Sequence, residues 1–115
     1  MAADDRSELL QGTLEMLVLK TLSLEPMHGW GIAQRIQAIS KDVFQVNQGS
    51  LYPALQRMKG RGWIRSMWQT TENNRRARYY ELTAAGRRQL GAATKEWERA
   101  AHAVNRILRF TEQES

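Results

Sequence analysis

The spacing of apolar residues changes twice along this chain, and the order of these changes restricts the fold more than any other feature of the sequence. Apolar residues recur at helical spacing in three segments before Gly62, within 10–26, 27–42 and 48–62. They then alternate with polar residues in two short runs, 63–69 and 78–83, and return to helical spacing from Ala84 to about Arg109. The sequence therefore predicts three helices, a β-hairpin and a long final helix.

This order of elements is that of a winged helix-turn-helix domain. The segment "TTENNRRA" between the two expected strands contains asparagines, which suit a turn. We expect a mainly α fold with a small β-hairpin and a long C-terminal helix. The winged helix-turn-helix DNA-binding domain is expected at 9–83, the C-terminal dimerisation helix at 84–110, and flexible ends at 1–8 and 111–115.

The third helix contains a proline that limits where it can begin. Either Asn47 or Ser50 could cap its first turn. Pro53 has no backbone N–H and is tolerated only near the start of a helix. We therefore expect the helix to begin close to 48–50.

The final helix has an apolar seam that one small domain cannot cover. Leu90, Trp97 and Val104 lie seven residues apart, and a second series interleaves with them at the same interval. The first helix also has two apolar sides, of which one suits the core and the other a partner. Pairing with a second copy would cover both surfaces. The expected homodimer interface comprises Leu14, Leu17, Leu90, Trp97, Ala101, Val104 and Leu108.

Positive charge is concentrated in the third helix and the hairpin. The net charge is +5, and segment 57–78 holds seven basic residues against Glu72 alone. In a winged helix-turn-helix, the third helix enters the major groove of DNA and the hairpin lies over the flanking backbone or minor groove. Arginines at the hairpin would neutralise phosphates, asparagines would donate neutral hydrogen bonds, and polar groups on the helix would reach base edges or phosphates. The expected DNA-binding residues are Gln48, Ser50, Tyr52, Gln56, Lys59, Asn73, Asn74, Arg75, Arg76 and Arg78.

Other classes of site find little support in the sequence. The chain has no cysteine, and its two histidines have no partner at metal-ligand spacing. No nucleophile beside a base, carboxylate pair or phosphate-cradling loop is present, so we expect no enzyme activity, no metal and no cofactor. The longest apolar stretch, 14–24, is too short for a membrane span, so a cytoplasmic protein is expected.

The tryptophans Trp30, Trp63 and Trp68 are expected to pack against other side chains of the protein and not to stack on nucleic-acid bases.

Three segments resemble the PadR family of bacterial transcriptional regulators. They are "GTLEMLVLKTLSLEPMHGWGIAQRI", "QGSLYPALQRMKGRGWI" and "RRARYYELTAAGRRQL", and the resemblance runs from about Leu9 to Leu90 with the long helix after it. It implies a homodimeric winged-helix repressor whose first and last helices form the interface, with Ser50, Tyr52 and the wing arginines on DNA. Some members bind aromatic effectors near the C-terminal helix, and Trp97 is the residue here that could stack on one. The wing has two asparagines where the family often has a glycine.

The sequence thus predicts a homodimeric, sequence-specific regulator of transcription, expected to be a repressor, whose partner is a double-stranded DNA operator. A small aromatic effector could release it from DNA. The alternative is a winged-helix module whose wing or third helix meets an acidic protein surface. Titration with duplex DNA at two salt concentrations separates the two, because about five phosphate contacts per subunit predict a log-log slope of about −4 to −5.

Overall fold

Four helices and three strands make up the described part of the chain, which in this computed structural model covers the backbone of residues 2–112 and the side chains of residues 12–112. The helices are α1 (Ala2–Leu24), α2 (Gly29–Ile39), α3 (Gln48–Gly60) and α4 (Ala84–Arg109). The strands are β1 (Met27–His28), β2 (Ile64–Thr70) and β3 (Arg76–Leu82). The predicted fold class, a mainly α winged helix-turn-helix with a long C-terminal helix, is confirmed.

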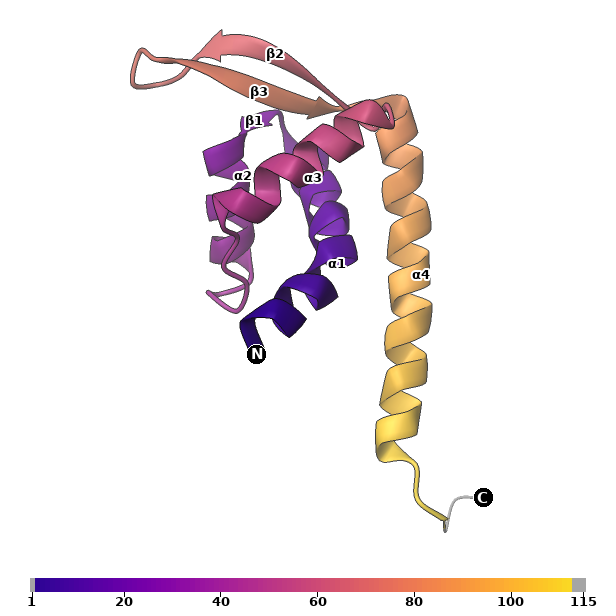
Figure 1. Cartoon of the computed structure of the whole chain (residues 1–115). Helices are drawn as coiled ribbons and strands as arrows, with labels where there is room; N and C mark the ends of the chain where they lie inside the picture. The colour runs from indigo at the N-terminus through magenta and orange to yellow at the C-terminus, as the bar shows by residue number, and fades with distance from the viewer. Residues whose placement is uncertain (1, 113–115) are drawn as a thin grey trace.

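The core lies where α1, α2 and α3 meet the base of the hairpin. Each helix contributes an apolar stripe to it, because residues three and four apart lie on one helical face. Figure 1 shows the three helices gathered beneath the sheet, with the hairpin reaching beyond them. The largest fully buried side chains are Leu19, Ile32, Leu51, Leu55, Met58, Ile64 and Val18.

The sheet has one strand more than the sequence predicted. Its order is β1-β3-β2, with both pairs antiparallel. In the hairpin, Ile64 lies opposite Leu82 and Trp68 lies opposite Arg78, while β1 pairs Met27 with Tyr80. Because β1 has only two residues, it has no alternating pattern that sequence reading could detect.

The start of α3 agrees with the sequence expectation, but its proline lies further in than expected. Asn47 is the N-cap, and its side-chain Oδ1 accepts a hydrogen bond of 2.8 Å from the Ser50 N–H. Pro53 lies in the second turn, inside the helix, so the Gly49 carbonyl has no i+4 donor. Both residues are exposed, so water can hydrogen-bond to that carbonyl.

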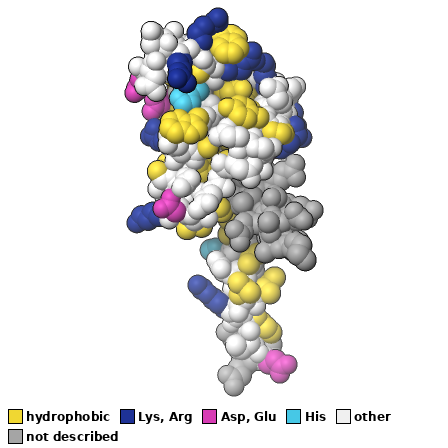
Figure 2. All heavy atoms as spheres, turned by 60° about the vertical axis from the view of Figure 1, so that its left-hand side comes forward, with side chains coloured by type: hydrophobic (Ala, Val, Ile, Leu, Met, Phe, Trp, Pro, Cys, Tyr) yellow, Lys and Arg dark blue, Asp and Glu magenta, His cyan; other side chains and the backbone are white. Residues whose placement is uncertain are grey.

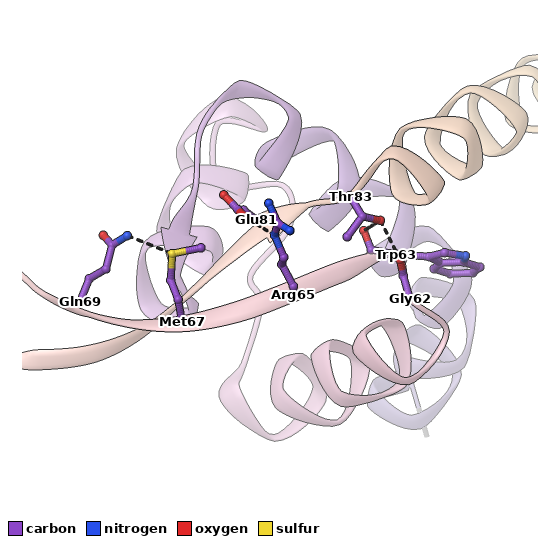
Figure 3. Close-up of polar contacts among 7 residues, drawn as sticks. All are labelled: Gly62, Trp63, Arg65, Met67, Gln69, Glu81 and Thr83. Carbon is purple, nitrogen blue, oxygen red and sulfur yellow. Dashed lines mark hydrogen bonds and ion pairs between the residues drawn. The ribbon is translucent and has the colours of Figure 1, made fainter.

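Helix α4 begins at a tight junction with the hairpin and then leaves the helical body. Thr83 caps it by accepting from the Gly86 N–H, and the same hydroxyl contacts the carbonyls of Gly62 and Trp63 (Figure 3). Figure 1 shows the later turns of α4 running past the other helices without a neighbouring element. None of the helices in the described residues has the length and apolar character needed to cross a membrane.

The ends of the chain were expected to be flexible at 1–8 and 111–115. Residues 2–8 lie within α1, which begins at Ala2. Met1 and residues 113–115 lie outside the described residues.

Candidate nucleic-acid interface

Helix α3 is buried on one side and polar on the other. Its buried stripe consists of Leu51, Ala54, Leu55 and Met58. The opposite side exposes four residues that the sequence assigned to DNA, namely Gln48, Tyr52, Gln56 and Lys59. Ser50 is half-buried in the first turn, beside the capping Asn47. The helix therefore presents amide, phenol and ammonium groups to a partner, all of which can bind base edges or phosphates.

Tyr52 is held between α3 and the neighbouring elements. A Cβ atom at Gly29 would lie 2.9 Å from the Tyr52 hydroxyl oxygen, so the glycine leaves room for the ring. Burial raises the pKa of Tyr80, Arg78 opposes that increase, and Tyr52 adds to it. Helix α3 also packs against β2, so the recognition helix and the base of the wing are adjacent.

The tip of the wing is a tight turn between Thr71 and Arg75. The Thr71 N–H donates to the Arg75 carbonyl at 2.7 Å, and the Asn74 N–H donates to the Thr71 carbonyl at 2.9 Å. Asn74 has a φ of 62°, which is in the left-handed region that asparagine tolerates better than most residues. Asn74 therefore takes a backbone conformation that glycine usually provides, and both asparagines remain exposed.

Three of the seven basic residues in segment 57–78 are paired with carboxylates. Glu15 of α1 binds Arg57 at 3.1 Å and Arg61 at 3.3 Å, and its side chain is only 15% exposed. Arg65 forms an ion pair with Glu81 across the hairpin (Figure 3). These pairs hold α1 against α3 and β2 against β3. Their charge is not fully available to a partner.

The remaining cations of that segment lie on the exposed side of α3 and on the wing. Among the residues whose side chains are described, no carboxylate pairs with Lys59, Arg75, Arg76 or Arg78. Figure 2 brings the wing side of the molecule forward and shows Lys and Arg side chains gathered around hydrophobic ones at its top. An anion that binds there meets uncompensated positive charge.

Comparison with known proteins agrees with this geometry. Residues 18–92 match the family described as "Transcriptional regulator PadR-like family", which is more than half of the chain. The chain belongs to this family.

Solved structures with the same fold include other PadR-like regulators. One from Eggerthella lenta is 26% identical with a TM-score of 0.79, and the match covers 96% of this chain and 94% of that chain. One from Bacillus cereus is 26% identical with a TM-score of 0.78, covering 90% and 99%. A transcriptional regulator from Clostridium thermocellum is 22% identical with a TM-score of 0.81, covering 89% and 99%, and it shows the likeness of the fold.

The predicted resemblance to PadR proteins is therefore confirmed, and the chain is a PadR-like transcriptional regulator. This family is one of regulators and not of enzymes. In the described residues, no three His, Asp or Glu side chains come together as a metal site. His28 has a structural contact, because its Nδ1 accepts the Gly31 N–H at 3.0 Å and caps α2.

The three tryptophans that the sequence singled out as packing residues differ in how much surface they expose. Trp63 is half-buried and packs against the core, as expected. Trp30 is 59% exposed and stacks on His28, and Trp68 is 55% exposed, so neither ring is buried in the core. Trp68 lies on the outer half of the wing, beyond the reach of the helices beneath its base. Only the hairpin register, which pairs Trp68 with Arg78, could have indicated its surroundings.

The residues expected at the dimer interface differ in how much surface they expose. Leu14 is buried in the core of its own chain and leaves little surface for a partner, whereas Leu17, Leu90 and Ala101 are half-buried. Trp97 and Val104 are each 52% exposed and Leu108 is 76% exposed. The sequence pattern missed Ile107, which is 73% exposed beside this seam on α4. The exposed apolar surface of α4 is thus concentrated in its later turns.

Proposed function

We propose that this PadR-like regulator binds a two-fold symmetric DNA operator as a cytoplasmic homodimer and represses transcription there. The observation that carries the proposal is the distribution of unpaired charge. Within segment 57–78, the cations without a described carboxylate partner are Lys59 and the wing arginines, on the two elements that contact DNA in a winged helix-turn-helix.

In the proposed complex, α3 enters the major groove and the wing lies along the flanking backbone. Gln48, Ser50, Tyr52, Gln56 and Lys59 contact base edges or phosphates from the helix. Asn73, Asn74, Arg75, Arg76 and Arg78 contact the sugar-phosphate backbone from the wing. The helix reads sequence, and the wing contributes affinity that depends little on sequence.

The proposed dimer forms along α4. Every described residue from 94 to 110 is exposed except Ala101, which is half-buried, so the described part of the chain leaves these turns of the seam uncovered. Burying exposed side chains such as Trp97, Val104 and Leu108 contributes about 1–2 kcal/mol each. From two copies, this gain is of the same order as the roughly 4–15 kcal/mol cost of association, and the half-buried Leu17 of α1 adds to it.

Repression follows from occupancy in this proposal. Two recognition helices about 34 Å apart would occupy successive major grooves and exclude other proteins from the same DNA. Trp97, on the seam, either fills the interface or stacks against a small aromatic effector. An effector that changes the angle between the two α4 helices would change the spacing of the recognition helices and release the operator.

Genomic fragments that bind the protein would first be selected, and the duplex that they identify would be titrated at several salt concentrations. Four unpaired cations per subunit predict a log-log slope of about −3.6 per subunit. Arg75→Ala with Arg76→Ala should reduce the slope by about 1.8 per subunit and weaken binding to all sequences. Lys95→Ala with Arg99→Ala removes the same charge from α4 and should leave binding nearly unchanged.

Absence of salt-dependent binding would contradict the proposal and favour a protein partner for this surface. If the wing and α4 variants lose affinity equally, the wing has no particular role.

The dimer is tested by sedimentation of seam variants. Trp97→Glu with Val104→Glu places two carboxylates on the seam and should yield monomers, because an unpaired buried charge is costly. Arg99→Glu with Arg106→Glu adds two carboxylates at the same spacing on the opposite face of α4 and should remain dimeric. A stable dimer in the seam variant would mean that the copies associate elsewhere.

A further inference from the structure

Trp68 lies on the outer half of the wing with two guanidinium groups over its indole ring. The guanidinium carbon of Arg78 is 4.9 Å from the ring centroid, and that of Arg76 is 5.2 Å from it. Both distances are within the range of a cation–π interaction. Trp68 nevertheless remains 55% exposed.

The hairpin register explains why these three side chains meet. Trp68 lies directly opposite Arg78, and Arg76 is two residues before Arg78 in β3, nearer the tip of the wing, so all three are on one face of the hairpin. Nearer the helices, the same face carries Ile64 and Tyr80, both buried in the core. The Trp68 cluster, defined as Trp68, Arg76 and Arg78, therefore continues the core-facing side of the wing outward, on the side where α3 lies.

The cluster brings together two like charges that have no carboxylate partner among the described side chains. Arg76 and Arg78 repel each other, and no described carboxylate pairs with either. The negative face of the indole ring offsets part of this repulsion, and Arg78 also donates a 3.4 Å hydrogen bond to the Ser66 hydroxyl. Two guanidinium groups held near each other in this way suit the oxygen atoms of a phosphodiester.

We propose that Trp68 is a positioning residue for DNA binding. Before DNA binds, its ring already holds Arg76 and Arg78 in the arrangement in which they contact the DNA backbone. This inference rests on the proposed DNA-binding function. A long side chain that is already ordered does not lose its freedom on binding, which is worth roughly 2- to 12-fold in affinity per side chain. Arg75 is next to Arg76 in sequence but has no such contact with the ring, so the effect is specific to two of the three wing arginines.

The experiment compares wing variants in titrations with an operator duplex isolated from genomic fragments. Trp68→Leu keeps an apolar side chain but removes the π system, and it should weaken binding by about fivefold or more. Trp68→Phe keeps an aromatic face and should bind within about threefold of the unaltered protein. Trp30→Ala is the matched control, because Trp30 is 59% exposed and has no described guanidinium over its ring.

A double-mutant cycle separates positioning from direct contact. Adding Trp68→Leu to Arg76→Ala with Arg78→Ala should cause no further loss, since the arginines through which Trp68 acts are gone. If Trp68→Leu still causes its full loss of affinity in the variant without the two arginines, the indole itself touches DNA. If Trp68→Leu binds as tightly as the unaltered protein, Trp68 has no role in DNA binding. Either outcome overturns the inference. If the unaltered protein binds no duplex, the proposed function itself fails, which is a distinguishable result.

Thermal denaturation checks that the variants fold. If Trp68→Leu unfolds, Trp68→Met replaces it in the same cycle, because methionine is also apolar and has no π system. A Met variant that loses as much affinity without the two arginines as with them would overturn the inference.

Discussion

Gly86, the third residue of α4, should be a position where alanine is not tolerated. A Cβ atom there would lie 2.1 Å from the Trp63 carbonyl oxygen and 2.7 Å from Cδ1 of Leu82. The carbonyl cannot easily withdraw, because it accepts hydrogen bonds from the backbone N–H and the hydroxyl of Thr83, both at 3.0 Å. Gly91 in the same helix is exposed and has no atom within 4 Å of its Cβ position.

The two glycines should therefore respond in opposite directions. Replacing a helical glycine with alanine ordinarily stabilises a protein by about 0.5–1 kcal/mol, which is the expectation for Gly91→Ala. At Gly86 the same gain is outweighed by overpacking, which costs about 1–3 kcal/mol, and by weakened hydrogen bonds to the Trp63 carbonyl at about 1 kcal/mol each. The expected net loss for Gly86→Ala is about 2–4 kcal/mol in the free energy of unfolding.

Denaturation by heat and by urea measures both variants. At about 4 °C per kcal/mol, Gly86→Ala should lower Tm by roughly 8–16 °C and Gly91→Ala should raise it by about 2–4 °C. All proteins must be compared at one concentration, because the stability of a dimer depends on it. A Gly86→Ala protein as stable as the unaltered chain would refute the reasoning, since it would mean that the junction accommodates a methyl group without strain.

Three further changes test other contacts. Thr83→Ala removes the N-cap of α4 and should cost about 1–2 kcal/mol in unfolding free energy, which Thr83→Ser should largely restore. Glu15→Gln breaks the ion pairs with Arg57 and Arg61 and should cost about 1 kcal/mol, less at high salt; an unchanged urea midpoint would contradict a stabilising role. Burial raises the pKa of Tyr80 above its ordinary 10.0. The unfolded chain therefore loses this proton first, so stability should fall as pH rises above about 10, and Tyr80→Phe should reduce that dependence.

Much of the fold could be predicted because its signals are local. The change from helical to alternating spacing after Gly62 marks the hairpin, and Asn47 before a polar and apolar repeat marks the start of α3. Strand β1 could not be predicted, because two residues carry no period and their pairing partner, β3, lies far along the chain. The position of Pro53 in the second turn was not predicted either. The Gly49 carbonyl that lacks a backbone donor there is exposed and can accept a hydrogen bond from water, so the proline costs little.

The candidate site was predicted in outline but not in its charge balance. The sequence count treated all seven basic residues of segment 57–78 alike. In the structure, Arg57 and Arg61 are paired with Glu15, which is 42 and 46 positions away, and Arg65 is paired with Glu81. Which cations remain for a partner depends on these long-range contacts.

The sequence by itself determined the helices, the hairpin, the family and the elements that carry positive charge, because spacing, caps and turn residues act over a few neighbouring positions. Only the tertiary structure decided that two arginines lie over the Trp68 ring, that Gly86 has no room for a methyl group while Gly91 does, and that Glu15 pairs with Arg57 and Arg61. Each of these depends on strand register or on the packing of distant elements. Such contacts are set by the whole core and leave no periodic trace in the chain.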